Sequence, residues 1–278
     1  MRQNDLWPLR VLLIFSLGLT ACAPPNKSTA IAEKKSFQKV LIQTNPFLLT
    51  TYQKMGGGHS TLTVYIEGDG RAWVTRHQLS HNPTPRQPLA LHLAMQDNHA
   101  AVAYLARPCQ YTPLHLDKAC NPKIWSSHRF SEMVISAMNE AVTQLKKTAK
   151  AQKINLIGFS GGGAISTLIA ARRTDIASLR TVAGDLNHET LSHYHQTTSL
   201  TGSLNPSDSI SRLTKIPQCH FSGGKDETVP PFIAKEFVAK INQSGFGCAK
   251  HLVIPDNTHH QFWEKEWKML LKVPLPCN

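Results

Sequence analysis

Ser160 is the residue of this sequence best suited to act as a nucleophile. It stands in the run GFSGG, residues 158–162, after an apolar stretch and before three consecutive glycines. At a sharp turn from a strand into a helix, side chains two positions before and after the apical residue would collide, and Gly158 and Gly162 remove them. The pattern G-x-S-x-G is that of a nucleophile elbow, in which the following N–H, here that of Gly161, can stabilise an oxyanion.

The alternative for this run is a glycine-rich turn that binds phosphate at a helix N-terminus. Its spacing does not match G-x-x-x-x-G-K-[ST], and no lysine follows. The apolar stretch before Ser160 and the helical pattern after it therefore favour the elbow.

A serine hydroxyl is a weak nucleophile and needs a histidine base that is oriented by a carboxylate. Asp226 follows a predicted strand and is favoured as the carboxylate over Asp185, at the end of the preceding strand, and Asp208, in a loop. Two histidines follow the last predicted strand, and only one of them can point into the site. We prefer His259 as the base, with His260 as the alternative.

The elements that would position these residues alternate along the chain. Helical patterns cover 88–97, 131–147, the stretch after Ser160, and the stretch from Pro230 to about Gln243. Eight apolar runs read as strands, at 37–44, 47–54, 62–68, 100–107, 154–160, 178–185, 217–224 and 251–256. The first two should form an antiparallel hairpin, and the later ones, separated by helices, should be parallel. This predicts a single α/β domain over 37–278.

These features together resemble the α/β-hydrolase superfamily over roughly residues 37–272. The runs YIEGDGRAW, RPCQY and TGSLNP are similar to those of a poorly characterised group of bacterial exported α/β-hydrolases. The resemblance implies an eight-stranded, mostly parallel sheet with helices on both faces. It also implies serine hydrolase chemistry without a metal or an organic cofactor.

The second oxyanion donor of such a site usually comes from the loop after the third strand. Here that loop is EGDGRAW, residues 67–73, and the N–H of Asp69 or Gly70 is the candidate donor. The loop departs from the HGGG type because Glu67 stands where a histidine would be. Its carboxylate could hold the loop by accepting backbone hydrogen bonds.

The amino terminus predicts export. Residues 11–21 form an apolar run of 11 residues, too short to span a bilayer but typical of a signal peptide. The sequence LTAC, which ends at Cys22, resembles a lipobox, so residues 1–21 would be removed and Cys22 would carry a lipid anchor. The alternative is an ordinary secretory signal. Residues 22–36 are predicted to be a flexible tether, and the protein is expected in the periplasm or at the cell surface.

Five further cysteines should form disulfides in an oxidising compartment. The local choice pairs Cys109 with Cys120 and Cys219 with Cys248, leaving Cys277 without an assigned partner. No CxxC pair favours a zinc site. Three nearby histidines lack a Cys or acidic partner at ligand spacing, so we predict no metal site there; they are His188, His193 and His195.

The predicted activity is cleavage of a small-molecule or lipid ester or a thioester, with a peptidase or a non-catalytic binding lipoprotein as alternatives. The formal charge is +12, or +11 without residues 1–21, yet no basic run interleaved with aromatics indicates nucleic-acid binding. Trp73 and Trp125 either line an acyl pocket or pack. Arg107 either binds a substrate carboxylate or braces its loop. The connection at 186–215 is long enough to form a lid.

Overall fold

Eight strands form one mixed sheet in this computed structural model, which describes residues 27–56, 60–75, 77–243 and 246–277. Their spatial order is β1-β2-β6-β3-β7-β8-β9-β10. The strands are β1 (Gln38–Gln43), β2 (Leu48–Met55), β3 (Thr61–Ile66), β6 (Ala101–Leu105), β7 (Lys153–Phe159), β8 (Ile176–Val182), β9 (Gln218–Gly223) and β10 (Ala249–Ile254). All eight lie where the sequence predicts a strand.

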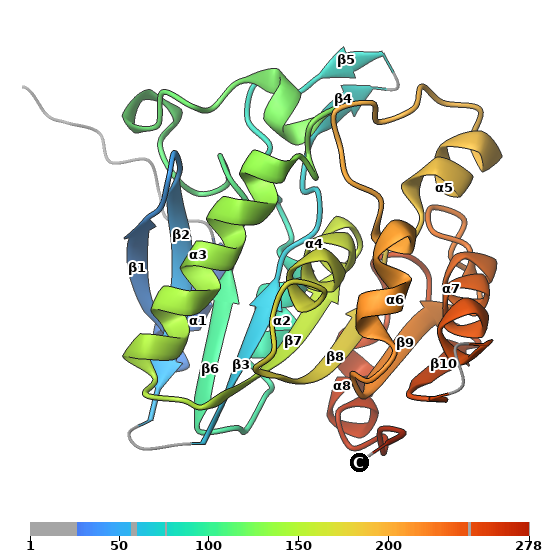
Figure 1. Cartoon of the computed structure of the whole chain (residues 1–278). Helices are drawn as coiled ribbons and strands as arrows, with labels where there is room; N and C mark the ends of the chain where they lie inside the picture. Colours follow the sequence, from blue (N-terminus) through green and yellow to red (C-terminus); the bar gives the residue numbers. More distant parts are fainter. Residues whose placement is uncertain (1–26, 57–59, 76, 244–245, 278) are drawn as a thin grey trace, which may run out of the picture.

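Strand direction follows the predicted pattern. β2 is antiparallel to both of its neighbours, β1 and β6, whereas every pair from β6 to β10 is parallel. The carboxyl ends of the parallel strands therefore lie at one edge of the sheet, the upper edge in Figure 1. Side chains that follow β3, β7, β8 and β9 are brought to this edge.

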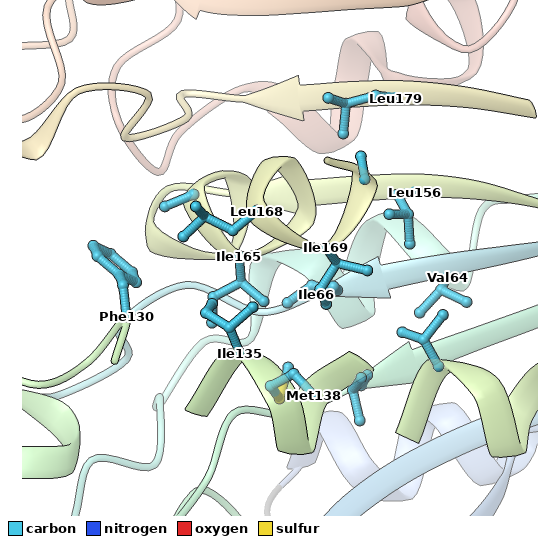
Figure 2. Packing of buried hydrophobic residues seen from close by; sticks show 14 of the residues in the cluster. Val64, Ile66, Phe130, Ile135, Met138, Leu156, Ile165, Leu168, Ile169 and Leu179 are labelled. Carbon is cyan, nitrogen blue, oxygen red and sulfur yellow. The ribbon is translucent and has the colours of Figure 1, made fainter. Parts of the chain in front are cut away.

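Helices cover both faces of the sheet. One hydrophobic cluster joins the sheet to α3 (Glu132–Thr148), α4 (Gly161–Ala170) and α7 (Pro231–Gln243). Figure 2 shows its centre, where Ile135 and Met138 of α3 face Ile165 and Ile169 of α4. A second cluster packs α1 (Lys27–Lys34), α2 (Leu89–Ala94) and α8 (Trp263–Leu270) on the other face. Because every residue of α4 is buried, the helix after Ser160 is held on all sides.

Two segments predicted as irregular contain regular structure. Residues 27–34 of the predicted tether form α1, and Ala32 packs into the second cluster, so the tether prediction is wrong for that part. The long connection 186–215 holds α5 (His188–Tyr194), a 3-10 turn (Pro206–Ser209) and α6 (Ile210–Leu213). The short hairpin β4 (Trp73–Thr75) and β5 (Gln78–Leu79) was also not predicted. Two further 3-10 turns, Leu114–Leu116 and Pro122–Trp125, lie between β6 and α3.

The cysteine pairing agrees with prediction at one site and differs at the other. Cys109 is bonded to Cys120. The predicted Cys219–Cys248 bond is wrong, because Cys248 is bonded to Cys277, with 5.2 Å between their Cα atoms. Cys219 is paired in register with Lys250, beyond Cys248 along the sheet, and is a buried free thiol in the second cluster. The C-terminal segment returns to the start of β10, a long-range contact that spacing does not reveal.

Candidate active site

Ser160 occupies a strained turn between β7 and α4. Its φ of 52° and ψ of −123° are values that a residue with a side chain rarely adopts. The turn is held by its own backbone: the Ser160 N–H donates to the Val182 carbonyl at 2.9 Å, and its carbonyl accepts from Gly163 at 2.8 Å and Asp185 at 3.1 Å. The neighbouring strand β8 thus fixes the serine, whose side chain stays half-exposed.

The flanking glycines are required by close backbone approach. A Cβ atom at Gly162 would overlap the carbonyls of Ile66 and Glu67, at the end of β3. A Cβ atom at Gly158 would overlap the backbone of Gly162 itself. Both positions therefore exclude any side chain, which is the steric reason anticipated for an elbow.

Ser160, His259 and Asp226 form a continuous hydrogen-bonded chain. The Nε2 atom of His259 lies 3.0 Å from Ser160 Oγ, and its Nδ1 atom lies 2.9 Å from Asp226 Oδ2. Because the carboxylate can only accept from Nδ1–H, Nε2 is left to accept from the serine hydroxyl. The exposed ring of His260 instead packs edge-on against Phe159, with 5.3 Å between ring centroids.

The acid and the histidine are each anchored by their own loops. Oδ1 of Asp226 accepts the N–H groups of Thr228 and Val229, both at 2.9 Å, and its side chain is fully buried. The indole N–H of the buried Trp263 donates to the His259 carbonyl at 3.1 Å. These contacts leave the imidazole little freedom to turn away from Ser160.

The carboxylate of Asp69 lies beside Gly161, where a Cβ atom would overlap it. It is bound by the Arg107 guanidinium and by Arg129, whose Nη1 lies 3.0 Å from Asp69 Oδ2. Burial alone would raise the pKa of Asp69, but the charges of Arg129 and Arg107 outweigh it and hold the pKa below its usual value. The two arginines thus keep this carboxylate ionised beside the elbow.

The N–H groups of Gly161, Asp69 and Gly70 all lie in this part of the site. In the described ranges of the chain, none of the three donates a hydrogen bond. Arg107 is only 4 % exposed and also donates to the Arg129 carbonyl at 2.6 Å, so its contacts brace the loop.

Glu67 holds the loop after β3 as expected. Its Oε1 accepts the N–H of Gly68 at 2.9 Å and that of Ala90 at 3.5 Å. Gln110, from the RPCQY run, adds a hydrogen bond from Nε2 to the Gly68 carbonyl at 3.0 Å. Burial raises the pKa of Glu67 to about 7, and the backbone hydrogen bonds oppose this only in part.

Neither of the two alternative carboxylates forms a hydrogen bond with His259, whose carboxylate partner is Asp226. Asp185 is buried next to the elbow, and burial raises its pKa to about 7 against the opposing charge of Arg129. Asp208 is exposed in a 3-10 turn between α5 and α6. Sequence reasoning missed Arg129, which sits in an irregular segment with no periodic signal.

The other side chains singled out in the sequence do not belong to the hydrogen-bonded chain of Ser160, His259 and Asp226. Trp125 is buried and donates to the Ser80 carbonyl at 3.1 Å, so it packs, whereas Trp73 is 45 % exposed. His188 is buried under Phe130, and His195 lies 2.9 Å from the Thr228 carbonyl. Over the described residues, no three His, Cys, Asp or Glu side chains gather in a way that could hold a metal ion.

The chain has the fold of α/β-hydrolases, and three similar solved structures illustrate this. An esterase from Pyrococcus furiosus has a TM-score of 0.58 and 15% identity, with 86% of this chain and 92% of that chain covered. Est1E from Butyrivibrio proteoclasticus has a TM-score of 0.60 and 16% identity, with 84% and 96% covered. At these identities the likeness shows the fold.

A third similar structure is a longer protein. An acylaminoacyl peptidase from Pyrococcus horikoshii has a TM-score of 0.62 and 11% identity, with 88% of this chain but only 42% of that chain covered. No family model matches the chain, and no curated protein matches it.

Proposed function

We propose that this protein is a serine hydrolase that cleaves carboxylic esters through an acyl-enzyme. The observation that carries the proposal is the chain from Asp226 through His259 to Ser160, with contacts of 2.9 and 3.0 Å. Nucleophile, base and orienting acid stand in the order and geometry that acyl transfer requires.

In the proposed reaction, Ser160 Oγ attacks the ester carbonyl while His259 Nε2 takes its proton. Asp226 holds the imidazole through Nδ1–H and stabilises its charged form. The same proton passes to the alcohol as the carbon–oxygen bond breaks, leaving an acyl group on Ser160. Water, activated by His259, then releases the carboxylic acid and restores the serine.

The oxyanion would be held by the Gly161 N–H and by the N–H of Asp69 or Gly70. Support comes from their position around the elbow and from the lack of another acceptor for any of them among the residues described. Preorganised donors of this kind stabilise the charge that develops in the transition state.

An ester is the favoured substrate class because one of the similar structures, matched over 92% of its length, is of a protein named as an esterase, whereas the named peptidase is matched over only 42% of its length.

A fluorophosphonate probe tests the proposal. Wild type should be labelled and Ser160→Ala should not. Ser166→Ala is the matched control, because Ser166 lies in the same helix with its hydroxyl fully buried; it should be labelled like wild type. Absence of labelling in a folded wild-type sample would favour a non-catalytic binding protein.

We also propose that the protein is exported and lipid-anchored at Cys22, which lies outside the described residues. The two disulfides suit an oxidising compartment. Within the described part of the chain, no helix has the length and apolar character needed to cross a bilayer. The full chain should fractionate with membranes, and Cys22→Ala should release it; unchanged membrane association of that variant would contradict the anchor.

A further inference from the structure

A cleft of about 590 Å³ opens between the β4–β5 hairpin and the segment that follows α5. Trp73 of β4 lies on one side of it, and residues 196–200 lie on the other. Figure 1 shows the hairpin and this segment at the upper edge of the sheet, where the parallel strands end. A larger cavity of about 740 Å³ lies by β1 and the end of α3, and none of the site residues lines it.

The cleft adjoins the elbow through a short series of contacts. Arg129 lines the cleft and lies 3.0 Å from Asp69, whose carboxylate is in turn beside Gly161. Ser160, Asp226 and His259 are not among the residues that line the cleft, so only a substrate larger than the reacting ester would reach from Ser160 into the cleft.

Most of the side chains that line the cleft carry a polar group. Hydroxyl, amide and imidazole groups are the commonest, and among the described lining residues only Leu200 is aliphatic. The side chains of His77, Gln196, Thr198 and Ser199 make no hydrogen bond to any other described residue. An acyl chain placed against them would cover donors and acceptors without replacing their bonds to water, which is costly.

The charged side chains of the lining also restrict which class of ligand the cleft can bind. Arg129, the one lysine or arginine among the described residues of the lining, is already paired with Asp69. No aspartate or glutamate lines the cleft among the described residues. Among the described lining residues an anionic group would therefore find no unpaired lysine or arginine, which favours a neutral ligand with many hydroxyl groups.

We propose that the alcohol part of the ester is a neutral carbohydrate, bound in this cleft with a sugar ring against the Trp73 indole. The half-exposed indole offers an apolar face for the C–H side of a sugar ring. Gln196, Thr198 and Ser199 meet its hydroxyls as donors and acceptors. The acyl group moves from a sugar oxygen to Ser160, and the sugar leaves with the proton from His259. This inference rests on the proposed function.

The test holds the acyl group constant and varies the alcohol. Monoacetylated xylotriose and cellotriose, glyceryl triacetate and 4-nitrophenyl acetate are given to wild type, Trp73→Ala, Trp73→Phe and Val74→Ala. Val74 is the matched control, because it is 44 % exposed on the same strand and neighbouring strand residues face opposite sides. Trp73→Ala should raise KM for the acetylated sugars about tenfold. The other two variants should stay near wild type, and 4-nitrophenyl acetate should be cleaved equally by all four proteins.

Binding without chemistry separates the two proposals. Calorimetry of Ser160→Ala with unesterified xylotriose and cellotriose should show binding that the added Trp73→Ala substitution removes. If sugars bind in this way but no ester is cleaved, the proposed hydrolase activity fails and the carbohydrate cleft stands. If esters are cleaved but neither sugar ester is preferred to glyceryl triacetate, or Trp73→Ala slows all acetates alike, the carbohydrate inference is overturned.

Discussion

The carboxylate of Asp69 rests against the backbone of Gly161, the residue that follows the nucleophile. This contact joins the loop after β3 to the N-terminus of α4, the two segments from which the oxyanion donors would come. Arg107 and Arg129 both bind Asp69, and Arg107 Nη1 also lies beside Gly161, so ion pairs hold the Asp69 carboxylate at the N-terminus of α4. A displacement of the loop after β3 should therefore also displace the backbone of Gly161.

The first prediction concerns Gly161→Ala. The added methyl group would overlap the Asp69 carboxylate and come within 2.7 Å of Arg107 Nη1, so it should push the two donor segments apart. Displacing one oxyanion donor should lower kcat about 10²- to 10³-fold. Ester hydrolysis measures the effect, and the melting temperature checks that the variant is folded. A folded Gly161→Ala protein with wild-type kcat would show that Asp69 does not set the donor spacing.

The second prediction separates the adjacent histidines. His259→Ala should lower kcat by at least about 10⁴-fold, because Ser160 loses the base within 3.0 Å. His260→Ala should stay within about tenfold of wild type, because its exposed ring packs against Phe159 and forms no hydrogen bond to Ser160. Hydrolysis of 4-nitrophenyl acetate by both variants provides the comparison, and the opposite order of effects would move the base to His260.

The strands and the three residues of the hydrogen-bonded chain could be predicted for one physical reason. Ser160, Asp226 and His259 each follow an apolar run, and the carboxyl ends of neighbouring parallel strands meet at one edge. Local pattern and global topology therefore agree at these positions. The sequence offered weaker support for choosing His259 over His260, because two adjacent residues after a strand can both reach the edge of the sheet.

The features that were not predicted depend on contacts between residues far apart in the sequence, which a local sequence pattern does not reveal. Arg129 follows no strand and begins no helix, and only the folded chain brings it to Asp69. Cys277 meets Cys248 because the segment after α8 folds back to the start of β10. Similarly, α1 forms where we predicted a tether because Ala32 is buried by packing.

The third prediction tests the cysteine pairing. Cys248→Ser should lower the free energy of unfolding by about 3 to 4 kcal/mol, because the disulfide closes a loop with a sequence separation of 29. In a domain of this size that is a fall in melting temperature of about 10 °C. Cys277→Ser should match it, and combining the two should add nothing. Cys219→Ala should cost only about 1 kcal/mol; a loss as large as that of Cys248→Ser would restore the Cys219–Cys248 pair.

The last prediction concerns Glu67 and pH. Burial raises the pKa of Glu67 to about 7 in the folded protein, so folding favours its protonated form. The stabilisation is fully present below the ordinary glutamate pKa near 4.5 and is lost as pH rises through about 7. The shift corresponds to about 3 kcal/mol. Asp185, whose pKa is also raised to about 7, acts in the same direction.

Glu67→Gln should therefore reduce the fall in melting temperature between pH 5 and pH 8. A glutamine resembles the protonated acid, and its side-chain oxygen can still accept from Gly68 and Ala90. Thermal melts of wild type and Glu67→Gln at both pH values measure the difference. Glu236→Gln, which removes an exposed carboxylate from α7, controls for the loss of one negative charge. Because only a buried carboxyl that takes up a proton on folding gives this slope, equal slopes in wild type and Glu67→Gln would mean that Glu67 is ionised in the folded protein.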